Sequence, residues 1–343
     1  MGHDRGMRHL LAVLVCCPAL ALGACSSAED AREPPANPIE SVPASPPTTP
    51  SGAGSPTTTP PTAPPTTPPR APRSPRLQPG DVRISTALAA IDTLAGDIGP
   101  RPGHTPAYFR AADYVEQELT SFGWSVERQR FRAPAGTYYD RPIDGGASVN
   151  LIATRGDVRP GRPYLIVGAH LDTVAGAPGA EDNASGVGTL LAIAEAAAER
   201  RTRLPVVLVA FGAEEPRGPG DDDHHYGSRA YVASLSGAER RSLQAMVSLD
   251  RVGVGAVVPV GSPAEPNALT DALQAAARRV GVPTTIDPFQ RSSDHWSFAR
   301  DGLPGARLGS TPYAGYHSPG DVPAVVDRAQ LARTAHLLAS WLH

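Results

Sequence analysis

The sequence predicts a single α/β domain in which a mixed, mostly parallel sheet is flanked by helices on both faces. Residues 164–167, Tyr-Leu-Ile-Val, form an apolar run that ends at Gly168, as expected for a strand buried on both faces. Helical and strand-like patterns alternate along the rest of the chain, which favours right-handed crossovers over a parallel sheet. Of the 343 residues, 41% are hydrophobic, which is sufficient for one substantial core.

The first residues have the character of an export signal. Arg5 and Arg8 precede an apolar run over residues 10–22, which is too short for a comfortable membrane span but has the size of a signal-peptide core. Residues 1–24 are therefore interpreted as a signal peptide. The run ends in Ala24-Cys25, which resembles the lipobox of bacterial lipoproteins, so Cys25 is the predicted lipid-bearing residue. The alternative is an ordinary signal peptide in which Cys25 is incidental.

Residues 25–80 are predicted to be a disordered linker that carries the lipidated cysteine at its start. Seventeen prolines fall between Pro34 and Pro79, interleaved with Ser, Thr and Ala. Such a segment buries too little apolar surface to offset its ordering entropy, and it should form an extended tether. We therefore expect an exported protein, anchored to the outer face of a bacterial cytoplasmic membrane, with its folded domain over residues 81–343.

Composition limits the remaining possibilities. The formal charge of -3 and the pI near 6.4 give no reason to expect nucleic acid as a partner. Cys16 and Cys17 lie inside the predicted signal peptide, so that only Cys25 would remain in the exported chain. No intrachain disulfide is then expected, and stability must come from packing and from metal.

The elements of the folded part can be predicted in order. The first helix is expected over residues 84–94, and Pro106 and Gly123 suit the two ends of a helix over residues 107–122. Strands follow at 124–132 and 149–154. After the central strand, a Leu- and Ala-rich helix is expected over 185–201. The later elements are strands at 204–211, 245–249 and 305–308, and helices at 226–235, 267–280, 293–300 and 327–342.

Titratable residues follow several of these strands, although charged groups are normally excluded from buried strand ends. A parallel sheet brings such ends to one edge, so donors far apart in the sequence should converge. The candidate ligands are two histidines and three carboxylates: His170, Asp182, one of the adjacent pair Glu214-Glu215, Asp250 and His317. This donor set without Cys suits zinc, and also cobalt or manganese, in an open catalytic site. Asp172 is the predicted partner that orients His170.

Five motifs occur together and in one order. They are His170-Leu171-Asp172, Asp182-Asn183-Ala184-Ser185-Gly186, Ala213-Glu214-Glu215, Leu249-Asp250 and Tyr316-His317-Ser318. Together they resemble the co-catalytic dizinc aminopeptidases of metallopeptidase family twenty-eight. The resemblance extends from about Ile84 to the end of the chain, and it implies the fold of the zinc exopeptidases.

The resemblance implies two zinc ions per chain. His170 and Asp250 would hold one, Glu215 and His317 would hold the other, and Asp182 would bridge them. Two metals about 3.5–4 Å apart can share a hydroxide and polarise the scissile carbonyl.

The resemblance also implies roles in catalysis. Glu214 would be the general base, Tyr316 would donate to the developing oxyanion, and Asp172 would support the first histidine. A cis peptide is often found after the bridging aspartate of the family, so the Asp182–Asn183 bond is expected to be one.

The leading hypothesis is an exported, lipid-anchored aminopeptidase that removes N-terminal residues from peptides. Three alternatives remain open. A glutaminyl cyclase uses a single zinc on the same fold, and a carboxypeptidase or amidase would use the same two metals. The third alternative is a catalytically inactive binding domain displayed on a stalk.

One segment departs from the family pattern. Residues 216–225, which include Asp221-Asp222-Asp223-His224-His225, separate the paired glutamates from Gly227-Ser228-Arg229, the expected start of a helix. We call residues 216–225 the insertion. It could be a lid or an accessory metal site, but a solvated acidic loop is the favoured interpretation.

The other histidines are expected to be structural or superficial. They are His104, His224, His225, His295 and His336. His295 lies in Ser293-Asp294-His295, a motif that recurs in the family and is expected to shape the pocket wall. Asp321 is expected either to support His317 or to cap the turn at Ser318-Pro319-Gly320.

Overall fold

The computed structural model describes residues 74–156 and 158–343. The predicted signal peptide, the lipidation at Cys25 and the proline-rich segment up to residue 73 lie outside the described residues. Ordered packing begins somewhat before the predicted boundary at residue 81. Arg76 forms a parallel bridge with Arg201, and Leu77 is fully buried in the core. No helix in the described part of the chain is long and apolar enough to cross a membrane.

An eight-stranded sheet forms the centre of the domain, with the strand order β1-β4-β6-β5-β7-β10-β8-β9. The strands are β1 Ser125–Ala133, β4 Gly146–Thr154, β5 Tyr164–His170, β6 Val206–Phe211, β7 Leu243–Leu249, β8 Val258–Gly261, β9 Thr284–Asp287 and β10 Gly305–Leu308. The four central strands β6, β5, β7 and β10 run parallel to one another. The pairs β1–β4 and β4–β6 on one side and β10–β8 on the other are antiparallel. This confirms the predicted mixed, mostly parallel sheet.

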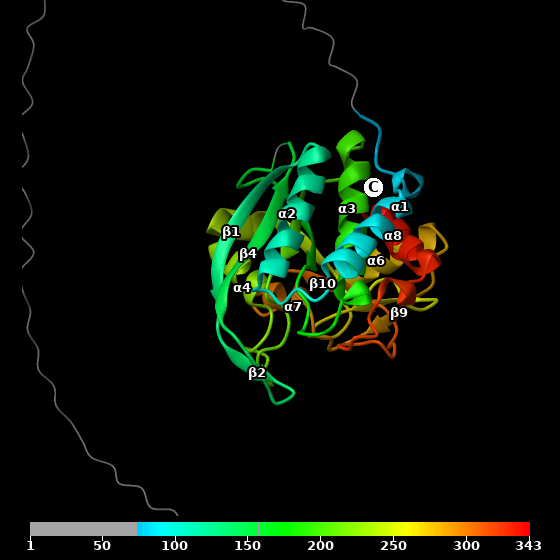
Figure 1. Cartoon of the computed structure of the whole chain (residues 1–343). Helices are drawn as coiled ribbons and strands as arrows, with labels where there is room; N and C mark the ends of the chain where they lie inside the picture. The colour runs from blue at the N-terminus through cyan, green and yellow to red at the C-terminus, as the bar shows by residue number, and fades with distance from the viewer. Residues whose placement is uncertain (1–73, 157) are drawn as a thin grey trace, which may run out of the picture. The chain divides into compact units, whose positions relative to one another are not determined.

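Helices cover both faces of the sheet. One face carries the larger apolar core, to which five helices contribute, namely α1 Ile84–Ile91, α2 Pro106–Ser121, α3 Ser185–Glu199, α6 Ala268–Arg279 and α8 Arg328–Leu342. On the other face, α4 Tyr226–Ser234 and α7 His295–Ala299 bury Tyr231, Val232 and Phe298 in a smaller core. In Figure 1, α1, α2 and α3 lie side by side in front of the strands.

The predicted helices and strands are all present, with ends that shift by a few residues. The first helix continues past α1 as a π-helical segment, Asp92–Ile98. Five short elements were not predicted, namely the two strands of the hairpin β2 Gly136–Tyr138 and β3 Arg141–Ile143, the helix α5 Gly237–Ser242, and the strands β8 and β9 at one side of the sheet. Three or four residues carry too little periodicity to show a strand. Figure 1 shows the hairpin projecting from the lower end of the sheet.

The topology places the chemistry at one edge. His170 is the last residue of β5, Asp250 directly follows β7, and Glu214 follows β6 after a two-residue turn. Because β5, β6, β7 and β10 are parallel, their carboxyl ends lie together. The predicted convergence of the strand ends is confirmed.

Candidate metal centre

Asp182 lies between the two histidines. One of its carboxylate oxygens is 3.2 Å from His170 Nε2, and the other is 3.2 Å from His317 Nε2. Glu215 Oε2 is 3.1 Å from the same His317 nitrogen, and Asp250 Oδ1 is 3.8 Å from His170 Nε2. The five predicted ligands therefore converge, although they come from widely separated parts of the sequence. All five side chains are buried.

The spacing of these atoms fits bound metal. Two donors on one tetrahedral zinc, each at about 2.0–2.1 Å, lie roughly 3.3 Å apart. Two groups of three side chains could each hold a metal ion, one of His170, Asp182 and Glu215 and the other of His170, Glu214 and Asp250; the second group thus includes Glu214, and neither includes His317. Within the described residues, Glu215 Oε1 and Asp250 Oδ1 are buried without a hydrogen-bond partner. Unpaired buried carboxylate oxygens are costly, and a cation would satisfy them.

The electrostatics also favour a cation. Burial lowers the pKa of His317, but the Glu215 and Asp182 carboxylates outweigh it and raise this pKa to about 10. Burial likewise lowers the pKa of His170, and the carboxylates of Glu214, Asp182 and Asp250 raise it well above its usual range. The same carboxylates would attract a divalent ion in place of these protons.

The loop that carries Asp182 is held by a buried guanidinium. Arg101 is fully buried and donates to the carbonyl oxygens of Leu171 at 2.7 Å, Pro178 at 2.6 Å and Gly179 at 3.0 Å. Gly179 has φ 68°, and a Cβ there would lie 2.5 Å from the Asp182 carbonyl oxygen, so glycine is required. The peptide between Asp182 and Asn183 is cis, as the family resemblance implies.

The strand-end turns adopt an uncommon backbone conformation. Ala213, His225, Arg251 and His317 all have positive φ values between 48° and 59°. Residues other than glycine rarely occupy this region, and such strain is often found at functional sites. His317 is a predicted ligand, Arg251 follows the ligand Asp250, and Ala213 and His225 adjoin or contact Glu214.

Asp172 contacts His170 differently from the prediction. Its carboxylate oxygen Oδ1 is 3.8 Å from His170 Nδ1, whereas its backbone carbonyl oxygen is only 3.2 Å from that atom. The two carboxylate oxygens instead accept the backbone N–H groups of Glu214 at 3.0 Å and Glu215 at 3.3 Å. Asp172 therefore positions the paired glutamates as well as the first histidine.

His317 has a partner that the sequence did not reveal. The hydroxyl of Tyr138, at the end of β2, is 2.8 Å from His317 Nδ1. The side chain of Asp321, expected either to support His317 or to cap the turn after it, instead accepts the backbone N–H groups of Glu181 and Asp182 and the hydroxyl of Tyr313. Its carboxylate thus holds the loop that carries the bridging residue.

The insertion is only partly a solvated acidic loop. Asp221 and Asp222 are exposed and pair with Arg291 at 4.0 Å and Arg300 at 2.8 Å, in agreement with the favoured interpretation. His225 is fully enclosed, and its Nε2 lies 3.1 Å from Glu214 Oε1. The sequence predicts a structural or superficial role for His225 and does not reveal its contact with Glu214. The only sequence feature that could have indicated this contact is the position of His225 just before the expected helix start at Gly227.

Tyr316 covers His317. Its ring stacks on the imidazole with centroids 3.8 Å apart and an interplanar angle of 21°, and 43% of the residue is exposed. Burial of the hydroxyl and the nearby Asp182 and Glu215 raise the pKa of Tyr316, which keeps the phenol protonated. The side chain can therefore donate a hydrogen bond at the mouth of the site.

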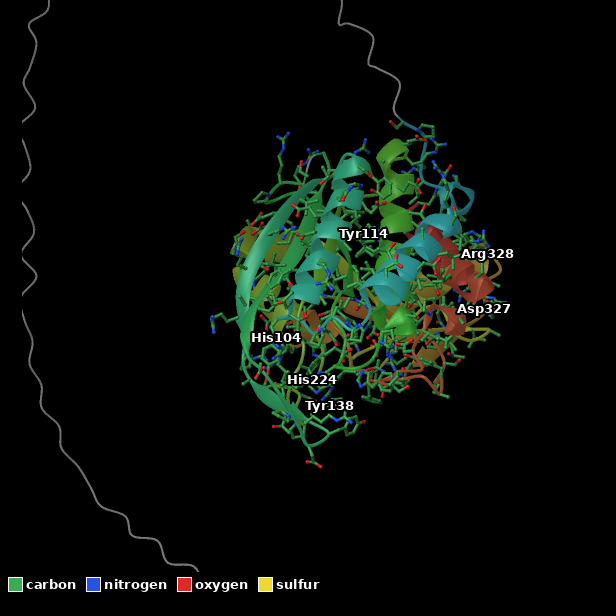
Figure 2. All side chains as sticks on the ribbon, viewed as in Figure 1. His104, Tyr114, Tyr138, His224, Asp327 and Arg328 are labelled. Carbon is green, nitrogen blue, oxygen red and sulfur yellow. The ribbon has the colours of Figure 1, made fainter. Side chains whose placement is uncertain are left out.

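The remaining histidines agree with their structural assignment. His295 is buried and pairs through Nε2 with the carbonyl oxygen of Gln290 at 2.8 Å. His104 is half-buried, 3.4 Å from the Arg217 guanidinium, and His336 lies on α8. Figure 2 shows His104, His224 and Tyr138 at the same lower end of the molecule, far from the start of α8.

Burial raises the pKa of Glu214 to about 8, against the lowering effect of nearby His170. Its Oε2 is 4.0 Å from His170 Nε2, so the side chain lies beside the cluster, with one oxygen toward His170 and the other toward His225.

The sequence model of peptidase family M28 matches residues 150–342, which include every predicted ligand. The chain belongs to peptidase family M28. Leupeptin-inactivating enzyme 1 of Streptomyces exfoliatus is 29% identical over 231 residues, which are 64% of this chain and 47% of that protein. The chain spans about half the length of the curated relatives that it matches.

Solved structures of other proteins share the fold. A zinc aminopeptidase from Bacillus subtilis superposes with a TM-score of 0.67 at 17% identity, covering 76% of this chain and 94% of that one. A glutaminyl cyclase from Porphyromonas gingivalis gives 0.64 at 23% identity, covering 76% and 98%. M28 membership and the buried His, Asp and Glu cluster support a zinc peptidase-like hydrolase.

Proposed function

We propose that the chain is an exported zinc-dependent aminopeptidase that hydrolyses N-terminal residues from peptides. The observation that carries this proposal is the position of Asp182. One of its carboxylate oxygens is directed to His170 and the other to His317, the two histidines that would bind different zinc ions. Glu214 lies directly beside this cluster. M28 membership and the fold shared with a zinc aminopeptidase support the assignment.

Two zinc ions would be held by the five converging residues. His170 and Asp250 would bind one ion, Glu215 and His317 would bind the other, and Asp182 would contact both. Bound zinc supplies Lewis acidity, which polarises a carbonyl group and lowers the pKa of water. The contact of 3.1 Å between Glu215 and His317 supports this pairing.

The chain's own residues would then move protons and orient the peptide. Glu214 is a buried carboxylate next to the cluster and is not one of the five predicted ligands. It would take a proton from water and return it to the leaving amine. The Tyr316 hydroxyl would donate to the oxygen of the scissile carbonyl as charge develops there. Asp172 would hold the backbone of Glu214 in place.

The lipid anchor belongs to this proposal. A signal peptide over residues 1–24, lipidation at Cys25 and a proline-rich tether would place the peptidase domain outside the cytoplasmic membrane, where peptides would be its substrates. The short apolar run before Cys25 and the composition of the tether support this arrangement.

The test combines metal content with a substrate panel. The domain starting at Ser74 would be assayed with aminoacyl-anilides, with the same compounds blocked at the amine, and with a peptide that begins with glutamine. Two zinc ions per chain and cleavage only of free N-termini are expected. One zinc with cyclisation of glutamine would indicate the cyclase branch of the family. Cleavage of blocked substrates would indicate a carboxypeptidase or amidase, and metal without turnover would indicate a binding domain.

A further inference from the structure

A cavity of about 450 Å³ lies next to the metal cluster, at the ends of β7 and β10. Two arginines line it, namely Arg251 and Arg307, with Tyr316 at the side nearest His317. We call it the arginine pocket. A second cavity of about 230 Å³ adjoins Glu215 and Asp172 on the other side of the cluster, and Arg217 is the arginine in its wall. A substrate at the metals would thus have space on both sides.

Arg251 offers unused hydrogen-bond donors. Its Nε lies 3.4 Å from Asp250 Oδ1, and its guanidinium carbon lies 4.7 Å from the centre of the Tyr316 ring. Among the described residues, its two terminal nitrogens make no hydrogen bond, although only 20% of the side chain is exposed. A guanidinium fixed by stacking, with free terminal nitrogens, is suited to bind a carboxylate through two parallel hydrogen bonds.

Arg307 reinforces the positive charge of the wall. One terminal nitrogen donates to the backbone oxygen of Asp250 at 2.8 Å, and its Nε lies 3.4 Å from Asp250 Oδ2. That Nε is buried without a hydrogen-bond partner in the described part of the chain. Arg307 of β10 and Arg251, which follows β7, thus place two guanidinium groups around Asp250.

The carboxylates near the pocket do not cancel the positive charge of its wall when metal is bound. Three carboxylates act on the arginines, those of Asp250, Asp182 and Asp287. Asp287 accepts a hydrogen bond from Gln290 Nε2 at 3.2 Å. If Asp250 and Asp182 both bind divalent ions, as the proposed function holds, two guanidinium groups remain against Asp287, and the wall carries excess positive charge.

We propose that the arginine pocket recognises a carboxylate of the substrate and that Arg251 is its main determinant of specificity. The inference rests on the proposed function. The carboxylate could be the side chain of an N-terminal Asp or Glu, or the α-carboxylate of a short peptide. Both sources share the same chemistry, and the experiment separates them.

The experiment compares substrates that differ only in charge. Values of kcat/KM are measured for Glu against Gln anilides and Asp against Asn anilides, and for Leu-Leu against Leu-Leu amide. A hydrogen-bonded charge pair should favour the acidic member roughly tenfold or more. A high Glu to Gln ratio identifies the side chain as the source. A high ratio of dipeptide to amide identifies the α-carboxylate.

Variants assign the effect to the pocket. Arg251→Gln should lower kcat/KM more for the acidic member of each pair than for the neutral one and so abolish the ratio, whereas Arg251→Lys should retain part of it. Arg241, an exposed arginine of α5, provides the matched control, because Arg241→Gln should leave the ratio unchanged. Melting temperatures verify that each variant is folded. All ratios within about twofold in the wild type would overturn the proposal, as would a ratio that survives in Arg251→Gln.

A binding measurement keeps this test independent of turnover. The melting temperature of the zinc-loaded domain is recorded with L-glutamate, L-glutamine, Leu-Leu or Leu-Leu amide, in the wild type and in Arg251→Gln. Larger stabilisation by the acidic member of either pair, lost in the variant, supports the pocket. Equal stabilisation within both pairs contradicts it. If no free N-terminus is hydrolysed, the leucine anilide included, the proposed function fails, and this comparison still decides whether the pocket binds a carboxylate.

Discussion

Single side chains divide the work at the cluster between binding and proton transfer. Asp182 faces both histidines, whereas Glu214 contacts His225 at 3.1 Å and lies 4.0 Å from His170. Adjacent glutamates thus point to different partners, since Glu215 is directed to His317. Removing Glu214 should therefore affect turnover without releasing metal.

The substitution Glu214→Gln tests this division. It preserves the shape of the side chain but removes the proton acceptor, so kcat should fall by about 10²–10⁴-fold while the zinc content stays unchanged. Glu199→Gln, at the exposed end of α3, is the matched control. Steady-state kinetics and elemental analysis provide the measurements. Retained activity would contradict the role of Glu214.

Tyr138 is expected to support metal binding through His317. Its hydroxyl meets the imidazole nitrogen that faces away from the cluster, and such partners set the tautomer and orientation of a ligand. Tyr138→Phe should weaken the affinity for the zinc that His317 would bind by about 10–100-fold. Competition with a chelator of known affinity measures the change. The neighbouring Tyr139, which is 74% exposed, gives the control Tyr139→Phe, and equal affinity in both variants would refute the role.

At the scale of elements, the hairpin β2–β3 and the insertion pack against each other beside the site. Thr137 N–H donates to the Arg217 carbonyl oxygen at 3.0 Å. The Arg217 guanidinium donates at 2.8 Å to the carbonyl oxygens of Pro134 and Asp144, which flank the hairpin. This contact connects the strand that carries Tyr138 with the loop that carries His225.

Gly136→Ala should disturb this contact. A Cβ at Gly136 would lie 1.9 Å from the backbone carbonyl oxygen of Arg217, so the hairpin must shift. Because Tyr138 would move with it, we expect kcat/KM to fall by about tenfold. The melting temperature should change little, since the hairpin lies outside both apolar cores. Gly80→Ala, where a Cβ has open space, serves as the control, and an unchanged kcat/KM in Gly136→Ala would show that the hairpin is dispensable.

On the scale of the whole molecule, the buried cluster couples metal to folding. The loops that carry its carboxylates connect different strands, and repulsion among those carboxylates opposes their convergence. Chelation should therefore abolish activity and lower the melting temperature, and added zinc should restore both. A thiol reductant is the control, because the described residues contain no cysteine. Unchanged thermal unfolding after verified removal of zinc would contradict the coupling.

The full chain tests the proposed anchor. Cys25→Ser should release the protein from the membrane fraction, because the lipid would have no attachment site. Cys16→Ser and Cys17→Ser should leave it in that fraction, since both lie in the predicted signal peptide. Fractionation followed by immunoblotting provides the measurement. Equal partitioning of all three variants with the wild type would exclude lipidation at Cys25.

The sequence by itself determined the fold class and the residues that converge at the candidate site. Long apolar runs such as β5 and α3 reflect burial that any compact packing must provide, so their type could be predicted from pattern alone. A titratable residue after each parallel strand then implied convergence at one edge, because parallel strands share their carboxyl ends.

Only the tertiary structure decided the contacts between distant segments. Tyr138 meets His317 across 179 positions of sequence, and Asp321 holds the loop of Asp182 rather than His317. His225 meets Glu214 because the insertion folds back on the strand end, and Arg251 and Arg307 line one pocket because β7 and β10 are neighbours. Such contacts depend on how short loops fold against the sheet. Short loops carry no periodic signal, so their positions follow from packing and not from local sequence.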